Sequence, residues 1–102
     1  MVVGRLENKL FTAAKKGDVC NLRIALEMGA NINALDNDGN TALILAVNGK
    51  NAECVWMLML HGASKFIPNK LGFTPQQIAL TKGAEQCARL IETTNSCFVL
   101  NI

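Results

Sequence analysis

The residue types in this sequence that could do chemistry are four cysteines and one histidine. The cysteines are separated by 34, 33 and 10 positions, so none forms the Cys-x-x-Cys pair of a zinc site or a redox motif. Their neighbours are small or apolar, which predicts buried, reduced thiols that act as small hydrophobic side chains. The residues concerned are Cys20, Cys54, Cys87 and Cys97. We therefore expect neither a metal ion nor another cofactor.

The single histidine offers no catalytic pair. His61 lies seven positions after Cys54 and next to Gly62, and no nucleophile motif surrounds either side chain. A polar residue at the C-terminus of a helix is the simpler interpretation. The sequence also has no paired carboxylates, phosphate loop or nucleophile–base motif, so we expect no enzymatic activity.

Length and composition are those of one small domain over residues 1–102. Half of the residues are apolar and 18% are charged, so the chain can bury a core. A net charge of +2 and only five aromatic residues argue against nucleic acid as a partner. No apolar run reaches the roughly 18 residues of a membrane span, and no secretion signal opens the chain. We expect a soluble cytoplasmic protein, with the nucleus, or a host cell if the chain is a bacterial effector, as alternatives.

A repeat of 33 residues organises the whole sequence. Identical residues recur at this step without any insertion, as in the pairs Gly39 and Gly72, Thr41 and Thr74, Ala46 and Ala79, and Cys54 and Cys87. The chain is therefore predicted to hold three units, at about 4–35, 36–68 and 69–102. Each unit is too small to bury its own apolar face, so the units should be stabilised by packing against one another.

Side chains with cap chemistry predict the first helix of each unit. Asn8, Thr41 and Thr74 occupy one register, and each can accept a hydrogen bond from the backbone through its side-chain oxygen. Gly17 and Gly83 break the chain after two of these helices. The first helices are expected at 9–16, 42–49 and 75–82.

The second helices are expected at 19–28, 52–61 and 85–94. Asp18 and Asn51 are the predicted caps of the first two. Left-handed residues should end these helices at Gly29, Gly62 and Asn95. Since Cys54 and Cys87 hold the same position on neighbouring helices roughly 8–10 Å apart, they should remain free thiols.

The segment 36–46, Asp-Asn-Asp-Gly-Asn-Thr-Ala-Leu-Ile-Leu-Ala, resembles the opening of the ankyrin repeat, which favours Asp-x-x-Gly-x-Thr-Pro-Leu-His-x-Ala. The segment 29–34 is similar to that family's Gly-Ala-Asp-Val-Asn-Ala loop. The resemblance covers about 90 residues and implies a mostly α, ankyrin-repeat solenoid of helix–turn–helix units joined by β-hairpin-like loops. Ala42 replaces the usual proline. Ile44 and Gln77 replace a histidine that steadies the turn, so the rigidity of this turn is in question.

The same resemblance implies a protein–protein interaction module that binds along its concave surface. That surface comprises loop tips and the exposed face of the first helices. Four lysines make it lean positive, so a partner segment with Asp, Glu or phosphate should fit; solvated lysines kept for solubility are the alternative. Carried over by position, its residues are Lys15, Lys16, Leu35, Asn37, Asp38, Asn40, Asn48, Pro68, Lys70, Leu71, Phe73, Thr81 and Lys82. Asp36 is assigned instead to holding the turn.

Four large apolar side chains have two interpretations each. Leu35, Leu71 and Phe73 stand at loop tips, where they could anchor a partner or pack on one another across adjacent loops. Trp56 shares its register with Arg23 and an arginine of unit three, which predicts an outward position. Its indole could stack under a guanidinium, or it could form a convex interaction site.

The C-terminal end gives mixed signals. Gln76 and Gln77 are polar where unit two is apolar, as expected of a terminal unit. The apolar tail 97–102 is expected to be extended. It could fold back over unit three, pair with another chain by strand addition, or be the cut edge of a longer protein. Without such pairing we expect a monomer.

We expect an adaptor or regulatory scaffold that binds another protein. Two further functions stay open at this point. The chain could be a fragment or recognition domain of a larger enzyme or secreted bacterial effector, or a small protein that inhibits an enzyme.

Overall fold

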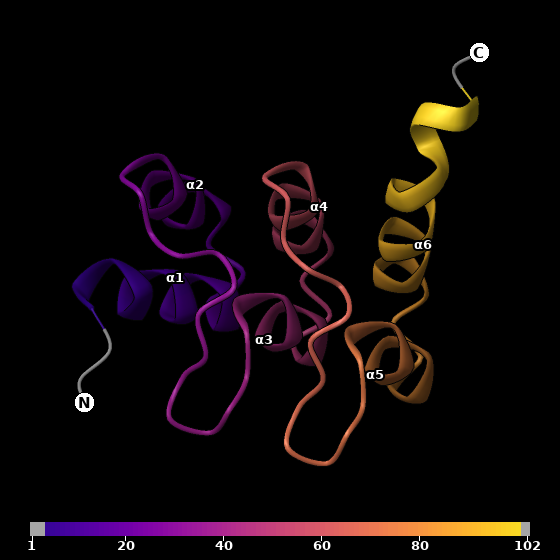
Figure 1. Ribbon diagram of the computed structural model, residues 1–102, viewed down its shortest axis with the longest axis horizontal. Helices are drawn as coiled ribbons and strands as arrows, with labels where there is room; N and C mark the ends of the chain where they lie inside the picture. The colour runs from indigo at the N-terminus through magenta and orange to yellow at the C-terminus, as the bar shows by residue number, and fades with distance from the viewer. Residues whose placement is uncertain (1–3, 101–102) are drawn as a thin grey trace.

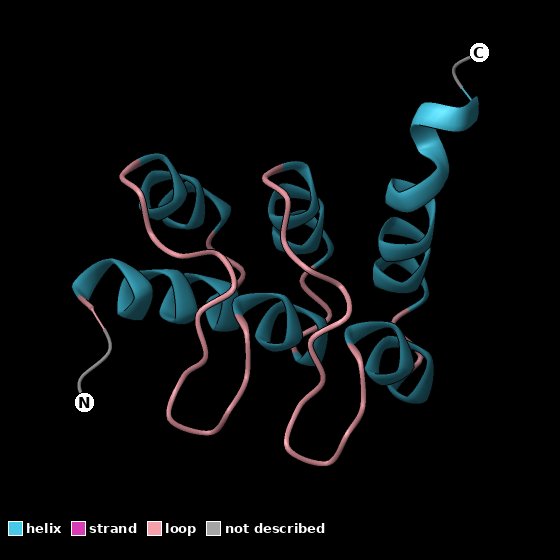
Figure 2. Cartoon of the chain, viewed as in Figure 1, coloured by secondary structure: helices cyan, strands magenta, loops and turns pink. Residues whose placement is uncertain are grey.

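The computed structural model describes residues 4–100, and it describes side chains as far as Glu92. This part of the chain contains six α-helices and no strand (Figure 2). In chain order they are α1 (Arg5–Lys16), α2 (Val19–Glu27), α3 (Ala42–Asn48), α4 (Ala52–Leu60), α5 (Pro75–Lys82) and α6 (Glu85–Leu100). Each consecutive pair forms one helix–turn–helix unit, as the 33-residue period predicts.

The helices form two rows (Figure 1). α1, α3 and α5 lie side by side in one row, and α2, α4 and α6 lie in the other. Within each row every helix contacts the next one, since α3 touches both α1 and α5, and α4 touches both α2 and α6. Two long loops project from the first row, on the side away from the second. Residues one period apart have equivalent surroundings, because Ala13, Ala46 and Ala79 are all buried.

The core is one continuous cluster that runs through all three units. Burying a large aliphatic side chain contributes about 1.5–3 kcal/mol, and the helices that carry these side chains contact the helices of the neighbouring units. The largest fully buried aliphatic residues are Leu10, Leu22, Leu43, Ile44, Val47, Val55, Leu58 and Ile91. The prediction that the units stabilise one another is therefore confirmed.

Three of the predicted helix caps are present. The Thr41 hydroxyl accepts the N–H of Ile44 at 3.2 Å, and the Asp18 carboxylate accepts the N–H of Asn21 at 3.1 Å. The hydrogen bond from the Asn21 backbone is also the main reason that the pKa of Asp18 is lowered. Thr74 and Gln77 form a reciprocal capping box, in which the Gln77 side chain accepts the Thr74 N–H at 3.0 Å. Gln77 thus bonds the threonine backbone where the family places a histidine.

Two predicted caps are wrong. α1 begins at Arg5 instead of residue 9, so Asn8 lies inside the helix. The Asn51 side chain does not cap α4. It crosses to unit one instead, where its Nδ2 donates to the carbonyl oxygens of Ala14 at 2.8 Å and Lys15 at 3.3 Å. The last carbonyl groups of a helix have no partner within that helix, so they attract a donor from the next unit.

The expectation for the C-terminal segment is also wrong. Gly29 and Gly62 adopt the predicted left-handed conformation, with φ of 100° and 86°. Asn95, in contrast, does not end a helix, because α6 continues to Leu100. Asparagine costs a helix only a fraction of 1 kcal/mol, so it does not by itself stop one. The last turns of α6 extend away from α5 (Figure 1), so residues 97–100 are neither an extended strand nor folded back over α5. Residues 101–102 lie outside the described part of the chain.

We predict that Asn51→Ala lowers the free energy of unfolding by about 1–2 kcal/mol, because two carbonyl groups at the end of α1 lose their donor. Urea unfolding followed by circular dichroism would measure the change. Gln86→Ala, which removes an exposed amide from α6, is the matched control and should change stability by less than about 0.5 kcal/mol. Equal effects of the two substitutions would contradict a stabilising role for the hydrogen bonds between Asn51 and α1.

Candidate functional site

One polar side chain holds each projecting loop in shape. In the first loop, the Asp36 carboxylate accepts the backbone N–H groups of Asp38 and Asn40, both at 2.9 Å. In the second, the Asn69 amide oxygen accepts those of Leu71 at 2.9 Å and Phe73 at 3.0 Å. Backbone bonds join the two arms of each loop, so both are hairpin-like turns. The role assigned to Asp36 is confirmed.

The two hairpins also contact each other. The backbone N–H of Ser64 donates to the side-chain oxygen of Asn33 at 2.9 Å. The aliphatic stem of Lys70 lies against Gly39, where an added Cβ would come within 3.0 Å of the lysine Cγ. Gly39 has φ of 78°, so it is needed for its backbone as well as for this contact. The hairpins are therefore held together as one surface.

A first recess lies between α1 and the tip of the first hairpin. Its volume is about 210 Å³, and it is open to solvent. One cation faces two carboxylates there, since Lys15 shares the recess with Asp36 and Asp38. The remaining lining residues are Asn8, Phe11, Thr12 and Asn37.

A second recess lies between the second hairpin and α5. Its volume is about 180 Å³. Phe73 and Ile78 supply apolar surface, and Lys82 supplies the one charge. Asn48, Asn69 and Thr81 complete it. Lys15 and Asp36 of the first recess stand 33 positions before Asn48 and Asn69 of the second, so these two positions are repeated. Beyond the hairpin residues, the rest of the first recess comes from α1, which precedes its hairpin, whereas the rest of the second comes mainly from α5, which follows its hairpin.

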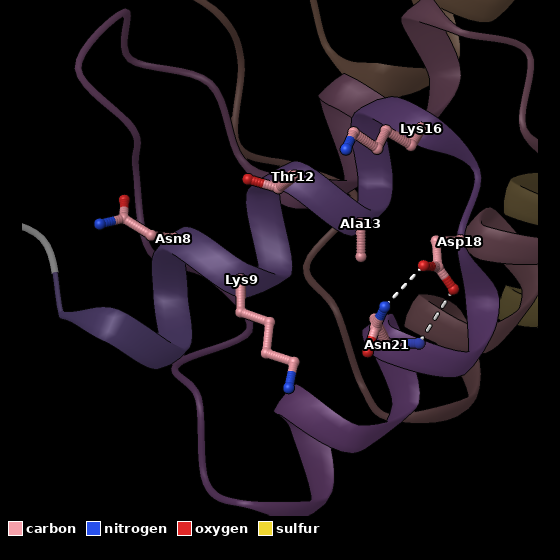
Figure 3. Close-up of a pocket in the computed structure, with 7 residues that line it drawn as sticks. All are labelled: Asn8, Lys9, Thr12, Ala13, Lys16, Asp18 and Asn21. Atoms are coloured by element: carbon pink, nitrogen blue, oxygen red, sulfur yellow. Dashed lines mark hydrogen bonds between the residues drawn. The ribbon is translucent and has the colours of Figure 1, made fainter.

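The structure brings seven of the predicted surface residues into these recesses. Lys15, Asn37 and Asp38 line the first, and Asn48, Phe73, Thr81 and Lys82 line the second. Lys16 lies elsewhere, in a separate pocket at the outer side of α1 and α2 (Figure 3). The others stand on the hairpin segments outside both recesses, namely Leu35, Asn40, Pro68, Lys70 and Leu71.

Three α1 residues of the first recess are not predicted from the sequence. Asn8, Phe11 and Thr12 line it, whereas the sequence assigns Asn8 to a cap before a helix that begins at residue 9. The period does not predict them either, because the residue 33 positions after Thr12 is Leu45, and Leu45 does not line the second recess.

The apolar side chains at the hairpins are strongly exposed. Leu71 is 80% exposed, Leu35 50% and Phe73 47%, so packing between the loops does not bury them. Trp56 is 49% exposed on α4, so it is outward as predicted. Of the two arginines in its register, Arg23 forms an ion pair with Glu27 at 3.9 Å.

The thiols and the histidine form no reactive site in the described residues. Cys54 and Cys87 are buried and free, as predicted, whereas Cys20 is exposed, contrary to expectation. Cys20 shares its register with the exposed residues Glu53 and Gln86, which places it on the outer side of α2. Side chains beyond Glu92, including that of Cys97, lie outside the description. His61 follows α4 and bonds through Nδ1 to the carbonyl oxygen of Met57 at 2.9 Å, so its interpretation as a residue at a helix end is confirmed.

Two kinds of site are absent from the described residues. They contain no group of three or more side chains able to hold a metal ion. None of their helices is both long enough and apolar enough to span a membrane.

Residues 10–98 match the family described as ankyrin repeats (3 copies). A protein of Treponema pallidum (strain Nichols) named for its ankyrin repeats is 37% identical over 75 residues, which are 74% of this chain and 25% of that protein. Human ankyrin repeat domain-containing protein 13C is 41% identical over 70% of this chain and 13% of its own length. The crystal structure of an ankyrin repeat domain from Acinetobacter baumannii AYE is 34% identical, with a TM-score of 0.79 over 84% of this chain and 46% of that one. The chain thus spans a quarter or less of these two curated relatives.

We predict that iodoacetamide at pH 8 modifies Cys20 in the folded protein and leaves Cys54 and Cys87 unmodified. Burial raises the pKa of both inner thiols, that of Cys54 to about 11, and the thiol form does not react. Peptide mass spectrometry would locate the label, and labelling in urea should reach all three residues. Label on Cys54 before unfolding would contradict the burial.

The raised pKa of Cys54 also predicts a pH dependence of stability. The folded state holds this proton up to about pH 11, whereas an exposed thiol loses it near 9.0. Its contribution is therefore complete below pH 9 and is lost between pH 9 and 11, by at most about 1.4 kcal/mol per pH unit. Urea unfolding across this range should show the loss, and Cys54→Ala should reduce the slope; an unchanged slope would contradict the assignment.

Proposed function

This chain belongs to the ankyrin-repeat family, and we propose that it is an adaptor or regulatory module that binds a segment of a partner protein across its two recesses. Ankyrin repeats are in general a non-catalytic protein–protein interaction module. The proposal concerns residues 1–102 as one binding domain. The surface consists of the first and second recesses together with the hairpin tips, and we call it the hairpin surface.

One observation carries the proposal. The hairpins present exposed apolar side chains on loops that hydrogen bonds hold rigid. Leu71 is 80% exposed although its own backbone N–H is bonded to Asn69. Burying a solvated apolar side chain in a pocket of a partner contributes favourable binding free energy. A rigid loop loses little conformational entropy on binding.

Charge within the two recesses favours an acidic or phosphorylated segment at the second. In the first recess, the carboxylates of Asp36 and Asp38 outweigh the positive charge of Lys15. The net positive charge expected for the whole surface therefore does not extend to this recess. In the second, the residue that holds the turn is the neutral Asn69, so Lys82 has no carboxylate beside it in the lining. We infer that the partner places an apolar side chain against Phe73 and an anionic group near Lys82.

We propose that the module is cytoplasmic, and the free thiols of the described residues support this because they fit a reducing compartment.

We predict that a random peptide library, displayed on phage and selected on the immobilised protein, enriches sequences with an apolar residue close to Asp or Glu. Lys82→Glu should reverse the preference toward Lys or Arg, because it reverses the charge of the second recess. Binding of the enriched peptides would be measured by fluorescence polarisation. Enrichment of sequences without acidic residues would contradict the charge assignment.

The double variant Leu71→Ala with Phe73→Ala should weaken peptide binding by roughly tenfold or more and leave the melting temperature almost unchanged. Leu60→Ala is the matched control, because Leu60 is 60% exposed on α4, away from both recesses, and it should bind peptide as the wild type does. An equal fall in melting temperature and in binding would assign Leu71 and Phe73 to the scaffold.

A further inference from the structure

The first unit ends the row with a polar face. In unit two, Cys54 meets unit one, with its Sγ 4.0 Å from the Ala13 carbonyl oxygen, and Ala42 and Leu45 of the same unit are buried as well. The residues 33 positions earlier form the outer face of unit one. They are Lys9, Thr12 and Asn21, all exposed, and with Lys16 and Asp18 they line a pocket of about 290 Å³ (Figure 3). Polar side chains therefore cover the outer face of unit one.

The third unit ends the row differently. Val47 of α3 is fully buried, and so is Ala14 of α1 in the same register. Leu80 of α5 holds this position in unit three and is 66% exposed. Figure 1 shows α5 and α6 at the end of the row, and no other helix of residues 4–100 lies beyond them. Phe66, on the loop before α5, is 73% exposed. This face, which we call the α5–α6 end face, therefore keeps large apolar side chains in solvent.

A recess in the end face contains a buried acceptor without a donor. It has a volume of about 270 Å³ and is lined by Lys65, Phe66, Thr74, Gln76, Ile91 and Glu92. The side-chain oxygen of Gln76 is buried and has no hydrogen-bond partner in the described part of the chain. An unpaired buried acceptor is destabilising until a donor reaches it. Gln76 lies one helical turn from Leu80, on the same side of α5.

The recess also carries one charge of each sign. Lys65 donates to the Ile91 carbonyl oxygen at 3.3 Å, and its ammonium lies 5.7 Å from the centre of the Phe66 ring. Glu92 lines the same recess. The one ion pair within 4.0 Å found among the described side chains, between Arg23 and Glu27, is on α2, so Lys65 and Glu92 are not paired with each other.

We propose that the α5–α6 end face binds the same face of a second copy of this chain about a two-fold axis. In such an interface each residue meets its partner reciprocally, and this face is complementary to itself. The amide of Gln76 has both a donor and an acceptor, so two copies can satisfy each other once this side chain turns from its buried position toward the partner. Lys65 of each copy meets Glu92 of the other, and Leu80 and Phe66 are covered on both.

The opposite end of the chain disfavours head-to-tail stacking. That arrangement would place the end face of one copy on the polar face of unit one in the next. Three lysines, Lys9 and Lys16 of one copy and Lys65 of the other, would then be buried with only two carboxylates, Asp18 and Glu92, and burying an unpaired charge is costly. The row therefore closes as a dimer instead of growing as a filament.

Exchange of charges tests the two-fold arrangement directly. By analytical ultracentrifugation, the wild type should reach twice its 11.0 kDa mass as concentration rises. Lys65→Glu and Glu92→Lys should each be monomeric alone, because each brings like charges together. Mixed in equal amounts they should form a heterodimer, because every cross-pair is then opposite in charge. This recovery also shows that both variants are folded.

A hydrophobic substitution gives an independent measurement. Leu80→Lys should raise the dimer Kd by roughly tenfold or more, while Leu60→Lys, of similar exposure but on α4, should leave it unchanged. Circular dichroism should show the same helix content for both. A wild type that stays monomeric at every concentration, a mass that grows beyond the dimer, or no recovery in the mixture would each overturn the proposal. Peptide binding at the hairpin surface uses other residues. The outcome of the peptide-binding experiments therefore does not affect the test of the dimer.

Discussion

No unit of this protein can bury its own apolar face, and the rest of the structure depends on this constraint. The middle helix α3 contacts α1 on one side and α5 on the other, and the buried side chains form a single cluster through all three units. Stability therefore resides in the contacts between neighbours. The hairpin tips and the two ends of the row take little part in these contacts. Their residues can vary without loss of the fold, so this is where recognition can be placed.

Apolar packing alone leaves neighbouring units free to slide, and specific hydrogen bonds fix their relative position. The Asn51 amide joins unit two to the last carbonyl groups of α1, and Asn33 joins the first hairpin to Ser64. Within unit one, the backbone N–H of Asn31 donates to the Glu7 carboxylate at 2.7 Å and ties the start of the first loop to α1. Each bond has a geometry that only one register satisfies. The hairpin surface is therefore preorganised, and less ordering is needed when a partner binds.

Local chemistry in the sequence predicted much of this fold, and contacts distant in sequence account for most of what it did not. Thr41, Thr74 and Asp18 act on backbone groups three residues away, so their roles follow from local sequence alone. Asn51 has the same cap chemistry, but it bonds to carbonyl groups 36 and 37 residues away, and only the stacked structure shows that those groups need a donor. The length of α6 was missed for a different and local reason, because a weak stop signal at Asn95 does not overcome helix propagation.

The candidate site was predicted less completely than the fold, because electrostatics is not repeated with the geometry. Asp36 and Asn69 do the same work, each accepting two backbone N–H groups through one side-chain oxygen. Asp36 leaves a negative charge beside Lys15, whereas Asn69 leaves none beside Lys82. The two hairpins thus keep one shape and present different potentials. A period found in the sequence predicts the shape at every repeat, but the binding preference of each recess depends on single residues whose charge the fold does not require. An array of this kind can therefore change what it binds, one hairpin at a time, while its core stays the same.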